Sequence, residues 1–286
     1  MINKVNYKLK GHEKFPPREG WMNKGISVAK EEGTHIFLEK QGPDMLGVGT
    51  NMVKSIRYWM QACGMLVKKG NKEVLSDLAE VIYKNDPYFE DIISLWIMHS
   101  YLSKNIEQAT VWYMFFNRFN VDSFSKADVQ QKVKQEVFSY IGQQATESSL
   151  KADIDVLLTM YSKCEDKNED PEDKIISPFS ALGIIRKEGE IYYKTQPDLR
   201  KISNELVLYE ISCLLGDSNA ISIESIASGE KSLGAIYNLT RVTVNKYLDN
   251  LETMGYIRVD RTAGLDMIYP LKIKNPIQII QDYYKK

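Results

Sequence analysis

The stretch GHEKFPPREGW, residues 11–21, concentrates charged, aromatic and proline residues in one short segment. The ionisable side chains in it that invite a chemical interpretation are His12, Glu13, Lys14 and Arg18. Lysine and arginine bind phosphate oxygens, while a histidine and a glutamate can pair with each other or with the arginine. The two prolines stiffen the segment, and Phe15 and Trp21 can anchor it. We therefore expect a pinned loop in which Lys14 and Arg18 contact phosphates, rather than a catalytic centre.

A magnesium-dependent nuclease needs carboxylates that converge on the metal, and the sequence offers only scattered ones. The candidate catalytic residues are His12, Glu13 and Asp153. Asp153 and Asp155 stand two positions apart in a predicted helix, so they do not share a face. The sequence also lacks a Walker loop, an HExxH or GxSxG motif and a Cys/His cluster. We expect no metal and no cofactor, apart from magnesium if the protein nicks DNA, and the catalytic residues stay unknown.

Three segments share the order short helix, turn, amphipathic helix, strand–turn–strand, which is typical of a winged helix-turn-helix. In the first segment, Thr50 is expected to cap a helix that runs to about Cys63. Its exposed side is expected to carry Asn51, Lys54, Ser55, Arg57, Tyr58 and Gln61. The basic turn that follows contains Lys68, Lys69 and Lys72. Amide and basic side chains of this kind suit base edges and phosphates, so we favour DNA contact over a protein-interaction role.

The last of the three segments, near the C-terminus, has the clearest winged-helix pattern. Thr240 is expected to cap a helix whose buried stripe contains Val244, Leu248 and Leu251, with Tyr247 and Met254 beside it. Two wing strands are expected at 256–259 and 266–269. The side chains expected to point outward are Arg241, Thr243, Asn245 and Lys246. This segment is therefore expected to add a second DNA contact.

The middle segment, roughly 125–195, is the weakest match. Thr146 is expected to cap a helix, and a hairpin is expected to turn at Glu188-Gly189. The outward side of this helix offers Lys151, Asp153 and Asp155, which suit a phosphate backbone poorly. We interpret this segment as a scaffold or a protein-binding face. The aromatic residues that precede it, and His99 among them, recur at helical spacing and are expected to be core.

These patterns predict a mainly α protein, of the α+β winged-helix type, with tandem modules and a central helical segment. The expected divisions are 1–84 (clasp and first winged helix), 85–124 (helical connector), 125–199 (second module) and 200–286 (C-terminal winged helix). Lys and Arg exceed Asp and Glu by five in the first division, whereas residues 85–199 carry a local charge of −7. No apolar run is long enough for a membrane span, and the N-terminus lacks a secretory signal, so we expect a cytoplasmic protein.

Several long segments of unusual composition cover nearly the whole chain. They are GHEKFPPREGWMNKG, LGVGTNMVKSIRYWMQACGM, DPYFED, SLWIMHS, ATVWYMFFNRF, SLKADIDVLLTMY, SPFSALGIIR and TAGLDMIYPL. In these segments the sequence resembles the bacterial domain-of-unknown-function family 4007, in its SspB-like branch. The resemblance implies a place in DNA phosphorothioation and phage-defence gene clusters, beside cysteine desulfurases and sulfurtransferases similar to PAPS reductase. A DNA-nicking role has been proposed for that branch, and the resemblance carries over no catalytic residue.

The residues and the resemblance together predict a component of a phosphorothioation or phage-defence system that binds duplex DNA through winged helices. The expected DNA contacts are Lys14, Arg18, Asn51, Lys54, Arg57, Lys68, Lys69, Lys72, Arg241, Asn245 and Lys246. The first alternative is a metal-dependent DNA nickase of the same system. The second is a non-catalytic adaptor or a transcription regulator. Cysteine desulfurase or PAPS-reductase-like proteins are the expected protein partners.

Overall fold

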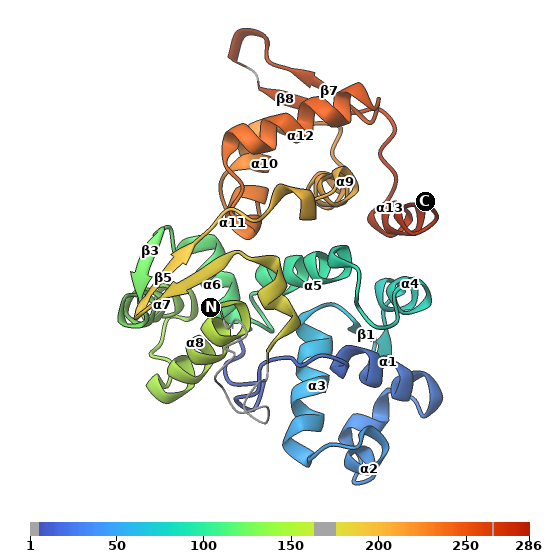
Figure 1. Cartoon of the computed structure of the whole chain (residues 1–286), viewed down its shortest axis with the longest axis vertical. Helices are drawn as coiled ribbons and strands as arrows, with labels where there is room; N and C mark the ends of the chain where they lie inside the picture. The colour runs from blue at the N-terminus through green and yellow to red at the C-terminus, as the bar shows by residue number, and fades with distance from the viewer. Residues whose placement is uncertain (1–5, 163–175, 265) are drawn as a thin grey trace. The chain divides into compact units, whose positions relative to one another are not determined.

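The structure is a computed structural model and describes residues 6–162, 176–264 and 266–286. The chain divides into two compact units, Met1–Thr195 and Gln196–Lys286, which we describe separately. Both units are rich in helices and contain small antiparallel sheets (Figure 1). This confirms an α-rich α+β fold. None of the helices in the described part of the chain has the length and apolar character that crossing a membrane requires.

The first part of unit 1 is helical apart from one hairpin. Its elements are α1 (Trp21–Glu31), η1 (Thr34–Leu38), α2 (Gly42–Leu46), α3 (Thr50–Ala62), β1 (Leu66–Lys69), β2 (Lys72–Leu75) and α4 (Asp77–Asn85). Strands β1 and β2 are antiparallel, with Lys69 opposite Lys72 beside the turn. The prediction that Thr50 caps α3 is wrong. Gly49 has the extended backbone of the N-cap and Thr50 is already helical, so no side chain caps this helix.

The second part of unit 1 surrounds a three-stranded sheet. Its elements are α5 (Ile92–Lys104), α6 (Thr110–Arg118), β3 (Ser123–Ser125), α7 (Lys126–Ile141), α8 (Glu147–Ser162), η2 (Pro178–Leu182), β4 (Ile185–Glu188) and β5 (Ile191–Lys194). The strand order is β3-β5-β4, all antiparallel. The expected division at residue 124 falls inside β3, and the pairing of β3 with β5 places that strand with the later hairpin. Residues 163–175, which are rich in Asp and Glu, lie outside the described residues.

Unit 2 combines helices with a three-stranded antiparallel sheet. Its elements are η3 (Leu199–Lys201), α9 (Asn204–Leu215), β6 (Ile221–Ser222), α10 (Ile223–Ala227), α11 (Leu233–Tyr237), α12 (Arg241–Thr253), β7 (Ile257–Asp260), η4 (Thr262–Gly264), β8 (Met267–Pro270) and α13 (Pro276–Tyr283). The strand order β6-β8-β7 matches that of the sheet in unit 1. Thr240 caps α12 as predicted, because its hydroxyl accepts the Thr243 N–H.

The core of unit 1 is aromatic. Its fully buried side chains include Trp59, Trp96, Trp112, Phe115, Phe116, Phe119 and Tyr161. His99 belongs to this core, as the helical spacing indicated, with its Nδ1 2.7 Å from the Tyr161 hydroxyl. These rings meet mostly edge to face, an arrangement that aromatic pairs favour. The core therefore provides a rigid support for the loop at residues 11–21 and for helix α3.

Candidate nucleic-acid interface

A buried histidine ties the loop at residues 11–21 to helices α3 and α8. His12 is 0% exposed, and its Nε2 lies 2.8 Å from Asp153 Oδ1. The ring of His12 stacks on Trp59, with the ring centres 5.9 Å apart. Trp59 donates its indole N–H to the carbonyl of Phe15 at 3.0 Å. These contacts make the loop a clasp, the role that its prolines and aromatics indicated.

Hydrogen bonds define the protonation of this histidine. The Lys14 N–H donates to His12 Nδ1 at 3.0 Å, so Nδ1 carries no proton and Nε2–H is assigned as the donor to Asp153. The carboxylate of Asp153 also accepts the Lys10 N–H at 2.7 Å. Burial raises the pKa of Asp153, and the hydrogen bond from His12 opposes that shift. The pair is thus a neutral imidazole bonded to a buried carboxyl group.

The three candidate catalytic residues do not form an open centre. The side chains of His12 and Asp153 are 0% and 1% exposed, and each is bonded to the other. Two predictions are therefore wrong: that His12 pairs with Glu13 or Arg18, and that Asp153 points outward. Asp153 turns inward because donors from the loop satisfy its carboxylate there. Glu13 is half-buried, and in the described part of the chain no three His, Cys, Asp or Glu side chains gather as metal ligands would.

Helix α3 presents a narrower polar face than its sequence predicts. Asn51 and Lys54 are exposed, whereas Arg57 and Gln61 are half-buried. The reason is Glu73 on β2, whose Oε2 lies 2.9 Å from Arg57 Nε and whose other oxygen accepts from the Gln61 amide. Arg57 therefore has an acidic partner inside the protein, and only Asn51 and Lys54 face solvent freely.

Ser55 and Tyr58 are 0% and 3% exposed, so the prediction that they lie on the exposed side of α3 is wrong. The loop at residues 11–21 covers this side of the helix. The hydroxyl of Ser55 is 3.5 Å from the carbonyl of Phe15. Gly11 approaches the Tyr58 ring so closely that a Cβ atom at position 11 would lie 2.4 Å from it.

The β1–β2 hairpin carries exposed lysines beside α3. Lys68, Lys69 and Lys72 are all exposed, and Lys69 lies directly opposite Lys72. Neither these three lysines nor Lys54 has an ion-pair partner among the described residues. Like charges that face each other across a strand pair are destabilising, so an anion bound here would relieve their repulsion.

A pocket of about 580 Å³ adds another cation next to this hairpin. Its lining includes Lys8, Gln61, Lys68, Glu73 and Gln108. The ammonium of Lys8 donates to Gln108 Oε1 at 3.2 Å. Burial lowers the pKa of Lys8, and the nearby Arg57 and Lys68 lower it further, whereas Glu73 opposes them. Lys8 is not among the contacts predicted from the sequence, because only folding brings the N-terminal segment alongside β1.

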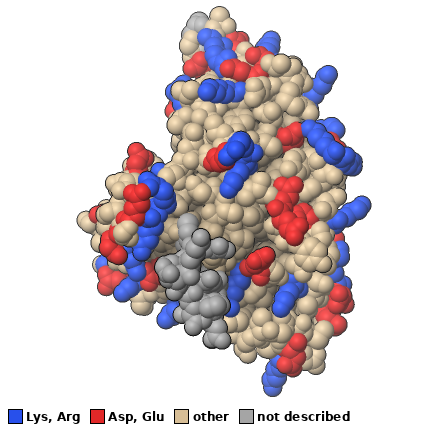
Figure 2. Space-filling model, in the orientation of Figure 1, with Lys and Arg blue, Asp and Glu red and all other residues tan. Residues whose placement is uncertain are grey.

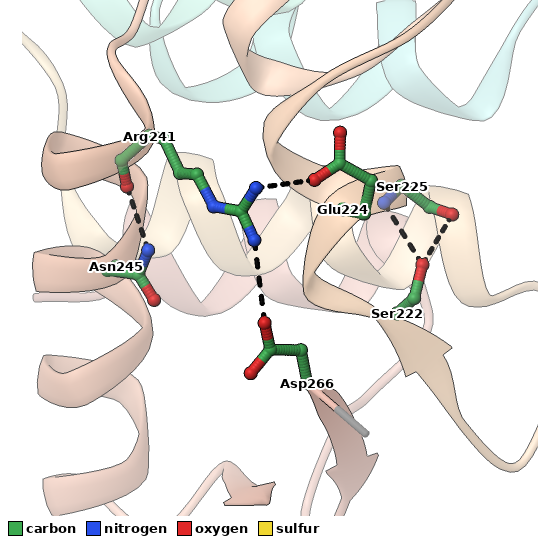
Figure 3. A network of polar contacts seen from close by, with 6 residues as sticks. All are labelled: Ser222, Glu224, Ser225, Arg241, Asn245 and Asp266. Atoms are coloured by element: carbon green, nitrogen blue, oxygen red, sulfur yellow. Dashed lines mark hydrogen bonds and ion pairs between the residues drawn. The ribbon is translucent and has the colours of Figure 1, made fainter. Parts of the chain in front are cut away.

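Helix α12 begins with an arginine that already has acidic partners. Figure 3 shows Arg241 between two carboxylates, with Nη1 2.7 Å from Glu224 Oε2 and Nη2 3.4 Å from Asp266 Oδ2. Asn245 donates to the carbonyl of Arg241 at 2.9 Å and accepts from Arg261 at 3.0 Å. Two of the three DNA contacts predicted on α12 are thus engaged within unit 2.

The other predicted outward residues of α12 differ from each other. Lys246 is exposed, whereas Thr243 is 6% exposed, so the prediction that Thr243 points outward is wrong. Its hydroxyl donates to Gln196 Oε1 at 3.0 Å, which draws the side chain inward. Met254, expected beside the buried stripe, is 45% exposed because it follows the last helical residue.

Charges of both signs share the surface. On the face drawn in Figure 2, basic and acidic side chains lie in small interspersed groups, without one continuous basic band. Helix α8 follows this pattern, since Lys151 is exposed and Asp155 pairs with Lys126. Lys14 is exposed, while Arg18 is half-buried. Contact with a polyanion would therefore depend on local clusters of basic side chains. The clearest of these is the α3–hairpin cluster, whose members have no ion-pair partner among the described residues: Lys54, Lys68, Lys69 and Lys72.

The fold and these clusters define an α-rich protein of two units with a local cationic surface on α3 and its hairpin. The chain belongs to the family of proteins of unknown function DUF4007, whose model matches residues 9–284. Crystal structures of magnesium ion-bound SspB and of SspB have similar folds, at 21% and 22% identity and a TM-score of 0.84 each. Each match covers 96% of this chain and 86% of the other. None of the curated proteins matches this sequence.

Proposed function

We propose that this protein is the DNA-binding component of a DNA phosphorothioation or phage-defence system. The observation that carries the proposal is the α3–hairpin cluster, whose lysines are exposed and have no ion-pair partner among the described residues. Duplex DNA carries one negative charge per about 1.7 Å of its axis, so a compact group of unpaired lysines matches its backbone. Lys8, in the adjoining pocket, adds a further positive charge.

The order of elements supports a winged-helix mode of contact. Helix α3 is followed directly by the β1–β2 hairpin, as a recognition helix is followed by its wing. The sheets β3-β5-β4 and β6-β8-β7 repeat one strand order. Among the described residues, helices α7 and α8 lie between the first two strands of the former in sequence, and helices α10, α11 and α12 between those of the latter. In this mode Asn51 reads a base edge, and the hairpin lysines hold phosphates. Helix α12 contributes Lys246 first, and Arg241 and Asn245 after they leave their internal partners.

Titration of duplex DNA across a salt series tests the proposal. Replacing Lys54, Lys68, Lys69 and Lys72 together by glutamine should weaken binding and flatten its salt dependence. Each phosphate contact that is lost lowers the slope of log K against log salt by about 0.9. Lys30→Gln is the matched control, because Lys30 in the same unit already pairs with Glu80. If the fourfold variant keeps both the affinity and the slope of the parent protein, the α3–hairpin cluster is not a DNA site.

Membership of the DUF4007 family and the fold shared with SspB support the assignment to a phosphorothioation or phage-defence system. The protein partners that this assignment proposes are a cysteine desulfurase and a PAPS-reductase-like sulfurtransferase. Tagged full-length protein should retain such partners from its native host, and the neighbouring genes should encode them. Neighbouring genes without any sulfur-handling enzyme or defence protein would contradict the assignment.

DNA nicking is the second candidate, and the similarity of the fold to magnesium ion-bound SspB favours it. The residues proposed for it fit a metal poorly, because His12 and Asp153 are buried and bonded to each other. Nicking would therefore depend on other carboxylates or on release of the loop at residues 11–21. Supercoiled plasmid with magnesium or manganese distinguishes the candidates, because metal-dependent relaxation would support nicking and its absence would favour DNA binding alone. Relaxation that persists in an Asp153→Asn variant would place the active centre elsewhere.

A further inference from the structure

A second pocket, of about 340 Å³, lies in unit 1 beside the end of the loop at residues 11–21. Segments that are distant in sequence build it, namely residues 17–22, 88–98 and 176–181. Its volume lies at the small end of the range for ligand sites, about 300 to 1,000 Å³, which suits a single small molecule. The apolar part of its lining includes Met22, Leu95, Met98 and Phe179.

Arg18 lines this pocket without a polar partner. Its guanidinium carbon lies 5.6 Å from the ring centre of Phe15 and 5.4 Å from that of Trp21. Among the described residues the guanidinium makes no ion pair and no hydrogen bond, and its Nε is buried and unpartnered. A guanidinium held by aromatic rings keeps its planar fork of N–H donors ready for a carboxylate.

Ser177 supplies a second unpartnered group in the same pocket. The residue is 1% exposed, and its Oγ is buried with no hydrogen-bond partner among the described residues. An unsatisfied buried hydroxyl destabilises the folded protein, and such groups are few in folded proteins. Two orphaned polar groups in one pocket point to a ligand that bonds both of them.

The remaining charges of the lining select among anions. Glu19 and Glu90 are exposed, line the pocket and have no ion-pair partner among the described residues. With Arg18 as the only cationic residue of the lining, two ionised glutamates disfavour a doubly charged phosphate or a DNA backbone. A molecule with one carboxylate and one ammonium group complements both signs.

We propose that this pocket binds an α-amino acid with an apolar side chain. The carboxylate bonds Arg18 and Ser177, and the ammonium group faces Glu19 and Glu90. The side chain of the ligand packs against the apolar lining contributed by α1, α5 and η2. Because the ligand contacts all three segments of the pocket, its binding stabilises unit 1 by linkage. This site is separate from the α3–hairpin cluster.

Calorimetry and thermal unfolding of the full chain test the proposal, with L-leucine and L-methionine as probes. The amino acids should raise the unfolding midpoint, and above the Kd the rise should grow with the logarithm of the ligand concentration. Two analogues should bind at least about tenfold more weakly than L-leucine, because each loses a charged contact. They are L-leucinamide, which lacks the carboxylate, and 4-methylpentanoate, which lacks the ammonium group. Tighter binding of a nucleoside 5′-monophosphate than of L-leucine, or no binding of any amino acid, overturns the proposal.

Variants separate the two ends of the ligand. Arg18→Gln and Ser177→Ala should weaken L-leucine binding, whereas Lys24→Gln, an exposed change on α1, should leave it unchanged. The double variant Glu19→Gln, Glu90→Gln alters only exposed side chains and should abolish the preference for L-leucine over 4-methylpentanoate. If Arg18→Gln fails to fold, this double variant decides, and a preference that it leaves intact contradicts the proposal. DNA binding should be the same in the double variant as in the parent protein.

Discussion

His12 and Asp153 form a buried hydrogen bond of 2.8 Å between residues 141 positions apart in the sequence. The bond joins the N-terminal loop to helix α8, and the Lys10 N–H donates to the same oxygen of Asp153. Both residues are inaccessible to a bulky substrate in this arrangement. This hydrogen bond therefore stabilises unit 1. It gives a structural role to two residues whose types are common in catalytic sites.

Asp153→Asn should lower the free energy of unfolding by about 1–3 kcal/mol, because a neutral amide oxygen accepts the two N–H donors more weakly than a carboxylate and the substitution buries an amide NH₂ group. Urea denaturation measures the change. Asp155→Asn is the matched control, two positions along α8, where the side chain is 41% exposed and pairs with Lys126. The control should cost no more than about 1 kcal/mol. Equal effects of the two substitutions would contradict a structural role for the buried pair.

Gly11→Ala should loosen the clasp. The added Cβ would lie 2.4 Å from a carbon of the Tyr58 ring, so the loop or the ring must shift, at a cost of about 1–3 kcal/mol. Thermal unfolding monitored by tryptophan fluorescence would report the change, since His12 stacks on Trp59. Gly49→Ala is the comparison, because a Cβ there meets nothing within 4 Å and the substitution costs only the preference of an N-cap for glycine over alanine. A variant at position 11 that is as stable as the one at position 49 would show that the loop adapts freely.

Lys194 should make stability depend on pH. Its ammonium donates to the carbonyls of Phe115 and Phe119, and burial lowers its pKa to about 7. The unfolded chain, with a lysine pKa of about 10.4, binds more protons than the folded chain between about pH 7 and pH 10. The free energy of unfolding should therefore rise with pH in that window, by up to about 1.4 kcal/mol per pH unit from this group.

Lys194→Met should remove that rise, as urea denaturation at pH values from about 6 to about 9 would show. Lys187→Met is the control, because Lys187 is exposed on the neighbouring strand β4. It should retain the slope of the parent protein. Parallel curves for the parent and the Lys194 variant would mean that the ammonium of Lys194 is solvated in the folded protein.

Glu73→Gln should strengthen DNA binding. Glu73 pairs with Arg57 and bonds Gln61, so its neutralisation leaves Arg57 without a counter-charge beside the α3–hairpin cluster. We expect the affinity for DNA to rise several-fold at low salt. The slope of log K against log salt should become steeper by about 0.9, the value for one phosphate contact. Glu80→Gln, which frees Lys30 on another surface of the same unit, should change neither quantity. Weaker DNA binding by Glu73→Gln would show that Glu73 shapes the interface instead of masking it.

Local patterns in the sequence predicted the elements well. The stripe of Val244, Leu248 and Leu251 is buried, and Thr240 caps its helix. The apolar stripe and the helix cap both depend on residues within one or two helical turns, so they can be recognised without knowing the rest of the fold. At Thr50 the same reasoning placed the cap one residue late, because a capping side chain was assumed, whereas the N-cap is Gly49, which has an extended backbone and no side chain.

The α-rich class, the aromatic core and the lysine-rich hairpin could all be predicted from the sequence, because periodicity and turn composition are local. Which polar residues are free depends instead on packing between distant segments. Glu73 pairs with Arg57, and Glu224 and Asp266 pair with Arg241, whereas His12 is enclosed with Asp153. A helical wheel shows which residues share a face but not what packs against that face. Ion pairs and burial between distant segments depend on that packing, which is why several predicted contacts are internal and Lys8 emerged only from the fold.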